Sequence, residues 1–200
     1  KVLNVVVAFL FSFVCFAQTM TVSTAGNHND PYWLIENVLV DSNFTVYKPI
    51  LPNGTFLNQP STNHAGFFQV NNNTGINAFP INKGIVMCTD NVTDVLPNVT
   101  GGKTPVLNNP KDASLAGVWA QTGTPITTNM YDFVEIQFAF TASSDSIRFN
   151  YIFSSGEYDN YTCSGFNDVF GFFITGSGIN GNTASSTVNL ATIPNTSVPV

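Results

Sequence analysis

Charged side chains are scarce in this sequence, and basic ones are the scarcest. Asp, Glu, Lys and Arg make up 9% of its 200 residues, against about 25% in an average soluble domain. The six Lys and Arg residues stand singly, and the formal net charge is -6. Proteins bind nucleic acid through clustered basic side chains that neutralise phosphates. We therefore expect no nucleic acid partner. With so few charges, the uncharged residues Asn, Thr, Ser and Gly must make the surface hydrophilic.

Common catalytic and metal-binding motifs are missing too. The run Gly102-Lys103-Thr104 resembles the end of a phosphate-binding loop, but Pro97 replaces its first glycine and Pro105 prevents the following helix. His28 and His64 lie too far apart to suggest a zinc site. There is no nucleophile elbow and no EF-hand spacing. No motif therefore predicts an enzyme.

Only one long hydrophobic run occurs, and it lies at the N-terminus. It covers residues 5–14, follows Lys1 and ends at Cys15-Phe16-Ala17, with small residues where signal peptidase reads them. At about 1.5 Å per helical residue it is too short to span a hydrocarbon core of about 30 Å. We expect a signal peptide over residues 1–17, and no membrane span in the mature chain. A membrane anchor, or acylation at Cys15, is the alternative.

Cysteine is rare as well, with three in the chain. Cys15 leaves with the predicted signal peptide. Cys88 and Cys163 remain, in a compartment that permits disulfides. These two cysteines are the candidates for one disulfide. The alternative is that both remain free thiols.

What the sequence does contain is short apolar segments between Gly-, Pro- and Asn-rich stretches. Residues 134–140 and 147–153 alternate apolar and polar side chains, which predicts a hairpin of half-buried antiparallel strands. Further strands are predicted at 44–47, 66–70, 84–88, 169–174 and 187–193. The stretch 90–128 has a loop composition. These patterns predict an all-β fold, an antiparallel β-sandwich of jelly-roll type, in one domain over residues 18–200.

One short N-terminal helix is predicted beside these strands. Asp30 can cap the free backbone amides and Pro31 suits the first helical position. Leu34, Ile35 and the following apolar residues then share one helical face. We expect this helix to end near residues 41–43 and to cover one end of a sheet.

The loop 154–168 is the densest group of chemically useful side chains. A cation such as calcium takes six to eight oxygen ligands from carboxylates, amides and carbonyls. The candidate calcium ligands are Asp132, Glu157, Asp159, Asn167 and Asp168. Capping of turns by the same side chains is the structural alternative. Glu157 and Asp168 are also the pair that a glycoside hydrolase would need. No other cofactor is expected.

The stretch 131–174 resembles a known family. Three runs carry the resemblance: Tyr131 to Phe140, Ile147-Arg148-Phe149-Asn150-Tyr151-Ile152-Phe153-Ser154-Ser155-Gly156-Glu157-Tyr158, and Phe166-Asn167-Asp168-Val169-Phe170-Gly171-Phe172-Phe173-Ile174. They look like the choice-of-anchor L domain of secreted, surface-attached proteins of Bacteroidetes-type bacteria. Two positions depart from the family pattern: Gly156 stands where a second acid is usual, and Cys88-Thr89-Asp90 replaces Ser-Thr-Gly.

The resemblance implies an exported β-domain on proteins whose C-terminal ends carry sorting or anchoring modules, so we expect the chain to lack its final strands and its anchor. The expected function is a non-enzymatic cell-surface module for adhesion or for binding carbohydrate or another ligand. Its expected partner is an extracellular glycan or a surface protein. A secreted polysaccharide hydrolase using Glu157 and Asp168, and a purely structural spacer, are the alternatives.

Overall fold

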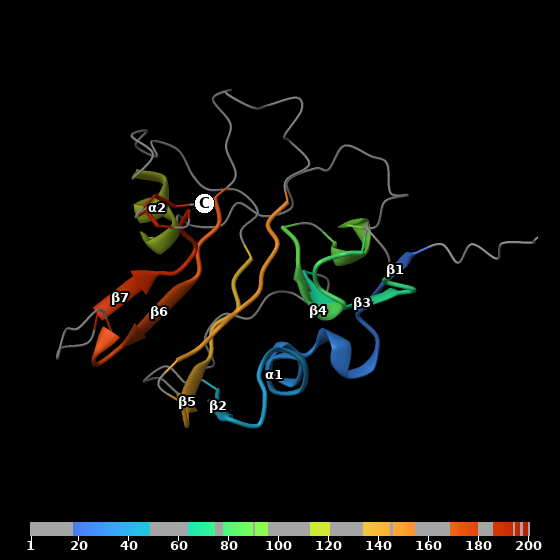
Figure 1. Ribbon diagram of the computed structural model, residues 1–200, viewed down its shortest axis with the longest axis horizontal. Helices are drawn as coiled ribbons and strands as arrows, with labels where there is room; N and C mark the ends of the chain where they lie inside the picture. The colour runs from blue at the N-terminus through green and yellow to red at the C-terminus, as the bar shows by residue number, and fades with distance from the viewer. Residues whose placement is uncertain are drawn as a thin grey trace, which may run out of the picture. The chain divides into compact units, whose positions relative to one another are not determined.

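The computed structural model describes residues 18–48, 64–74, 78–89, 91–95, 113–120, 134–144, 146–154, 169–179, 186–193, 195–196 and 198–199. The chain divides into two compact units (Figure 1). Unit 1 comprises Lys1–Thr100 with Glu135–Ser143, and unit 2 comprises Gly101–Val134 with Ser144–Val200. Regular structure is mostly strand, in small antiparallel sheets. The predicted signal peptide, residues 1–17, lies outside the described residues and stays a prediction.

The largest described sheet belongs to unit 1 and has the strand order β1-β3-β4. Its strands are β1 (Thr19–Ser23), β3 (Ala65–Asn71) and β4 (Lys83–Met87), and both pairs are antiparallel. The two strands predicted at 66–70 and 84–88 are confirmed. β1 was not predicted, because its short run of threonines around one Met and one Val carries a weak strand signal.

The predicted N-terminal helix is confirmed (Figure 1). A 3-10 turn, η1 (Gly26–Asn29), leads into α1 (Pro31–Leu34), which continues as the π-helical segment η2 (Ile35–Leu39). Asp30 accepts the backbone N–H groups of Tyr32 at 2.9 Å and Trp33 at 3.4 Å. The helix contacts β3 and β4, so it covers this sheet as expected. Its inner residues Leu34 and Ile35 are 0% exposed.

The widening to a π-helix has a local cause. The side-chain amide of Asn37 donates to the carbonyl of Trp33 at 2.8 Å, an acceptor that an α-helix reserves for the backbone N–H of residue 37. The helix then closes with a bond from the Val40 N–H to the Ile35 carbonyl at 3.1 Å. An amide side chain thus competes with the helical ladder near the end of the helix.

Replacing Asp30 by alanine should remove this cap and destabilise unit 1 by about 1 kcal/mol. Asp30→Ser keeps an oxygen acceptor at the same position, so its loss of stability should be only a few tenths of the loss in the alanine variant. The midpoint of urea unfolding, at unchanged slope, measures both variants. Equal midpoints for the two would contradict the assigned capping role.

Unit 1 contains a second, two-stranded antiparallel sheet among the described residues. It pairs β2 (Phe44–Tyr47) with β5 (Ala139–Ala142), and the rings of Phe44 and Phe140 lie 5.7 Å apart. The strand predicted at 44–47 is therefore confirmed. The predicted hairpin of residues 134–140 and 147–153 is wrong in its pairing, because β5 pairs with β2. Its first strand is found only from Ala139 onward, and the described residues 134–138 and 146–154 form no strand.

Tyr32 ties the helix to the segment that precedes β5. Its side chain is 5% exposed, and its hydroxyl donates to the carbonyl of Gln137 at 3.5 Å. The ammonium of Lys48 lies 4.6 Å from the centre of its ring. Burial, and secondly the charge of Asp30, raise the pKa of the Tyr32 phenol. The phenol therefore stays protonated and keeps its hydrogen bond to higher pH.

Unit 2 has one two-stranded antiparallel sheet in its described part, β6 (Phe173–Gly176) with β7 (Ser186–Asn189) (Figure 1). The strands predicted at 169–174 and 187–193 are confirmed in part, each with shifted bounds. An eight-residue helix, α2 (Ala113–Ala120), corrects the prediction of a single helix. It lies in the stretch whose Pro and Gly content suggested loop, although three alanines and one leucine, half of its residues, are good helix formers.

The alternation predicted for residues 147–153 is visible as a shared face of unit 2. The ring of Phe149 meets that of Phe172 edge-on at 4.8 Å. The rings of Tyr151 and Phe153 lie 5.2 and 5.6 Å from that of Phe170. Alternate side chains therefore point to one side, as in a strand, without the backbone ladder.

The all-β prediction is thus confirmed in part, because regular structure is mostly strand in small antiparallel sheets, whereas the sandwich and jelly-roll arrangement stays a prediction. The described core of buried apolar side chains comprises Tyr32, Leu34, Ile35, Ala65, Val70, Val92, Val118 and Ala191. Within the described ranges, neither helix has the length and apolar character needed to cross a bilayer.

Candidate functional site

The residues predicted to bind calcium or to catalyse hydrolysis lie outside the described residues. They are Asp132, Glu157, Asp159, Asn167 and Asp168. The described part of the chain contains no group of three His, Cys, Asp or Glu side chains that could hold a metal ion. The calcium site and the hydrolytic pair therefore stay predictions from sequence.

The candidate disulfide also stays a prediction, because Cys163 lies outside the described residues. Cys88 is half-buried directly after β4. Its N–H donates to the carbonyl of His64 at 3.0 Å, and its carbonyl lies 3.2 Å from Nδ1 of the same histidine. These contacts close the β3–β4 pair at the end where β3 begins.

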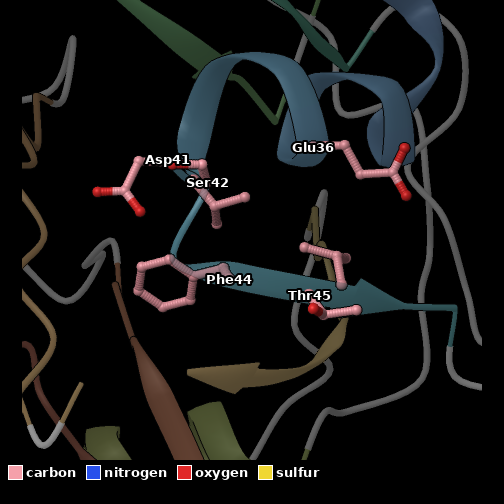
Figure 2. Close-up of a pocket in the computed structure, with 7 residues that line it drawn as sticks. Glu36, Asp41, Ser42, Phe44 and Thr45 are labelled. Atoms are coloured by element: carbon pink, nitrogen blue, oxygen red, sulfur yellow. The ribbon is translucent and has the colours of Figure 1, made fainter. Parts of the chain in front are cut away.

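Two open depressions lie on unit 1. The first has a volume of about 460 Å³ and lies between the end of the N-terminal helix and β2 (Figure 2). Its lining residues are Glu36, Val40, Asp41, Ser42, Phe44, Thr45 and Val46. Figure 2 shows the carboxylates of Glu36 and Asp41 at opposite ends, pointing away from each other.

This first depression is a poor place for paired-carboxylate chemistry. A shared cation needs several oxygens converging on one point, and acid/base work needs two carboxyl groups facing one bond. One carboxylate oxygen of Asp41 is also engaged, since it accepts the N–H of Asn43 at 2.8 Å to form the turn into β2. We assign Asp41 to the turn.

The second depression has a volume of about 400 Å³ and a different chemistry. It lies beside the β3–β4 pair, where β3 ends and β4 begins, and is lined by Gln69, Val70, Asn73, Asn82 and Lys83. Its side-chain functional groups are three amides and one ammonium group, with no carboxylate. Gln69, Asn82 and Lys83 are exposed. Such groups donate and accept hydrogen bonds without the charge density that a metal ion requires.

Asn73 holds this depression together. Its side-chain oxygen accepts the Gln18 amide at 2.6 Å and the N–H of Phe79 at 2.5 Å. Its side-chain NH2 donates to the Phe79 carbonyl at 2.8 Å and to the side-chain oxygen of Asn82. An Asn amide has two donor hydrogens and two acceptor lone pairs, so these four bonds match its full capacity.

Because of these four bonds, Asn73→Ala should destabilise unit 1 by about 2 kcal/mol, half of what four net bonds of about 1 kcal/mol would give, since the site is partly exposed. Asn71→Ala is the matched control. The Asn71 side chain accepts one bond, from Gln69 at 3.3 Å, and its loss should cost about 0.5 kcal/mol. Urea unfolding measures both, and equal losses would contradict the role given to Asn73.

Sequence reasoning missed this depression. The run Asn71-Asn72-Asn73 has the composition of a loop, and Gln18 adjoins the predicted signal peptide. The lining residues come from β3, from β4 and from the residues beside these strands. A pattern within one segment therefore gave no signal for them.

Comparison with known proteins gives one match. The family model described as the Choice-of-anchor L domain matches residues 21–200, which includes every described element beyond the start of β1. No curated protein and no solved structure matches the chain. The match confirms the resemblance drawn from the runs around Tyr131, Glu157 and Asn167.

Proposed function

This chain belongs to the choice-of-anchor L domain family and is therefore a surface-associated module, and on that premise we propose that it is a non-enzymatic adhesion module. It is exported through the N-terminal signal peptide over residues 1–17 and held at the cell surface by an anchoring region of the same protein. There it attaches the cell to a glycan or to a surface protein. The observation that carries this proposal is the family match over residues 21–200.

The structure of unit 1 supports a binding role. Its exposed polar groups are largely uncharged, and two open depressions lie on it. Small-molecule ligand sites are usually deep and mostly apolar. Open surfaces with hydrogen-bonding groups are better suited to long or flat partners. A chain with a net charge of -6 also avoids nonspecific binding to polyanions.

Attachment of beads coated with the purified protein tests the adhesion proposal. The beads are offered to surfaces coated with polysaccharides, with extracellular matrix proteins and with whole cells. We expect retention on at least one surface, above that of beads coated with the heat-unfolded protein. Equal retention of both bead types on every surface would contradict the adhesive role.

Product release from the same polysaccharides tests the non-enzymatic part of the proposal. We expect no new reducing ends above the blank. Cleavage by the wild-type protein that disappears in Glu157→Gln would overturn this part and establish the hydrolase alternative. Cleavage that persists in Glu157→Gln after repurification would also overturn this part, and would assign the activity to other residues than the predicted pair.

Calcium binding by the loop 154–168 remains a separate prediction. A ligand that binds only the folded state stabilises it by mass action, by about 2.7 kcal/mol at a hundredfold excess over Kd. Excess calcium should therefore raise the melting temperature, and a chelator should lower it again. Asp168→Asn should reduce the shift, whereas Asp41→Asn, in the turn before β2, should leave it unchanged. An unchanged melting temperature in calcium would remove the prediction.

A further inference from the structure

The sheet β1-β3-β4 carries a polar half on one of its faces. Directly paired residues of neighbouring strands lie on the same face. The register pairs Thr19 with Asn71, Thr21 with Gln69, and Gln69 with Lys83. These five residues therefore form rows across the strands, which lie side by side in Figure 1. We call them the polar half-face.

The other half of the same face is apolar and covered. There the register aligns Ser23, Phe67 and Ile85. The ring of His28 stacks on that of Phe67 at 4.8 Å and lies 5.4 Å from that of Trp33. The helical segment thus covers one half of the face, whereas Thr19, Thr21, Gln69 and Lys83 in the polar half are exposed.

The amide-lined depression adjoins this polar half-face, because Gln69 and Lys83 belong to both. One of its lining residues, Asn73, is held by four hydrogen bonds. Groups that are already held in place lose little conformational freedom on binding. The amides of Asn73 and Asn82 are thereby held in place. The exposed side chains of Thr19, Thr21, Gln69 and Lys83 lie on the same sheet.

We propose that the polar half-face and its depression bind a glycan chain through the chain's hydroxyl groups. Gln69 and Asn82 supply amide donors and acceptors, and Lys83 supplies a donor to a hydroxyl or to a uronate carboxylate. The openness of the depression suits the middle of a chain rather than an enclosed end group. This inference rests on the proposed adhesive function and names its ligand class and its contact surface.

The chemistry of the surface disfavours other ligands. A cation would need carboxylates, and none lines the depression. A nucleic acid would need several basic side chains, and the lining has only Lys83. An apolar peptide would need apolar contacts, whereas Val70, the one apolar lining residue, is 7% exposed. Neutral and uronate-containing glycans share the hydroxyl groups that amides recognise.

Affinity electrophoresis of the purified protein through gels containing a neutral β-glucan or a polyuronate tests the proposal. The double variant Gln69→Ala/Lys83→Ala should weaken binding at least tenfold on a glycan that retards the wild type. The matched control Gln137→Ala/Arg148→Ala also removes one amide and one cationic group, from exposed positions elsewhere, and should bind like the wild type. Lys83→Ala alone should weaken polyuronate binding more than neutral glucan binding.

The outcomes distinguish a failure of the proposed glycan surface from a failure of the proposed adhesive function. Unchanged retardation of the double variant overturns this contact surface, although the adhesive function would stand. Retardation of the wild type by neither glycan, with bead attachment to a protein-coated surface retained, overturns the glycan ligand alone. Failure of both the gel and the bead assays overturns both proposals. Melting curves of each variant ensure that weakened binding is compared between folded proteins.

Discussion

Replacing Leu34 by alanine should lower the free energy of unfolding of unit 1 by about 3 kcal/mol. Leu34 lies in the last turn of α1 and is 0% exposed. The helix contacts β3 on one side, so removal of the isobutyl group leaves a cavity among packed neighbours. The loss combines the transfer free energy of the missing carbons with the cost of that cavity. Urea unfolding followed by circular dichroism measures it.

Leu39→Ala is the matched control on the same helical segment. Leu39 closes the π-helical segment and is 39% exposed. Much of its side chain already meets water, so the same substitution should cost less than about 1.5 kcal/mol. A loss at Leu39 as large as that at Leu34 would show that the helix does not bury the face assigned to it.

The second large effect is expected from a single added methyl group. Gly66→Ala should destabilise unit 1 by about 2 kcal/mol, because its Cβ atom overpacks a closed site. That Cβ would lie 2.9 Å from the backbone oxygen of Ser23 and 3.3 Å from methyl groups of Thr24 and Val92. The backbone oxygen cannot rotate away, so β1 and β3 must separate.

Gly117→Ala makes the same chemical change with the opposite expected sign. Gly117 lies inside α2, and an added Cβ would meet nothing within 4 Å. Alanine in a helix interior is favoured over glycine by about 0.5–1 kcal/mol. In thermal unfolding, the melting temperature should therefore fall for Gly66→Ala and rise for Gly117→Ala, relative to the wild type. Destabilisation by both would contradict the open environment of α2, and stabilisation by both would contradict the close β1–β3 contact at Gly66.

Local signals predicted the local structure well. The pair Asp30-Pro31 set the start of the helix, because capping and a fixed φ act within a few residues. The apolar runs at 66–70 and 84–88 became β3 and β4 nearly as bounded, since turn-forming residues flank each run. α2 was missed because the Pro and Gly content of the surrounding stretch outweighed its own helix formers.

Pairing over long distances was less predictable. The alternation over residues 134–140 identified a strand only in part, because β5 covers Ala139–Ala142 and residues 134–138 form no strand. Periodicity also does not choose a partner. β5 pairs with β2, whose Phe44 contacts Phe140, rather than with the next alternating segment along the chain. The amide-lined depression was missed for the same reason, because Asn73 gathers Gln18, Phe79 and Asn82 from separate segments. The acidic residues that sequence favoured lie outside the described structure.

The most direct test of the surface assignment is antibody labelling of intact cells that produce the protein. We expect the labelling of intact cells to equal that of lysed cells, and brief treatment of intact cells with protease to remove it while a cytosolic marker survives. Labelling that appears only after lysis and resists protease in intact cells would contradict a surface-associated adhesion module.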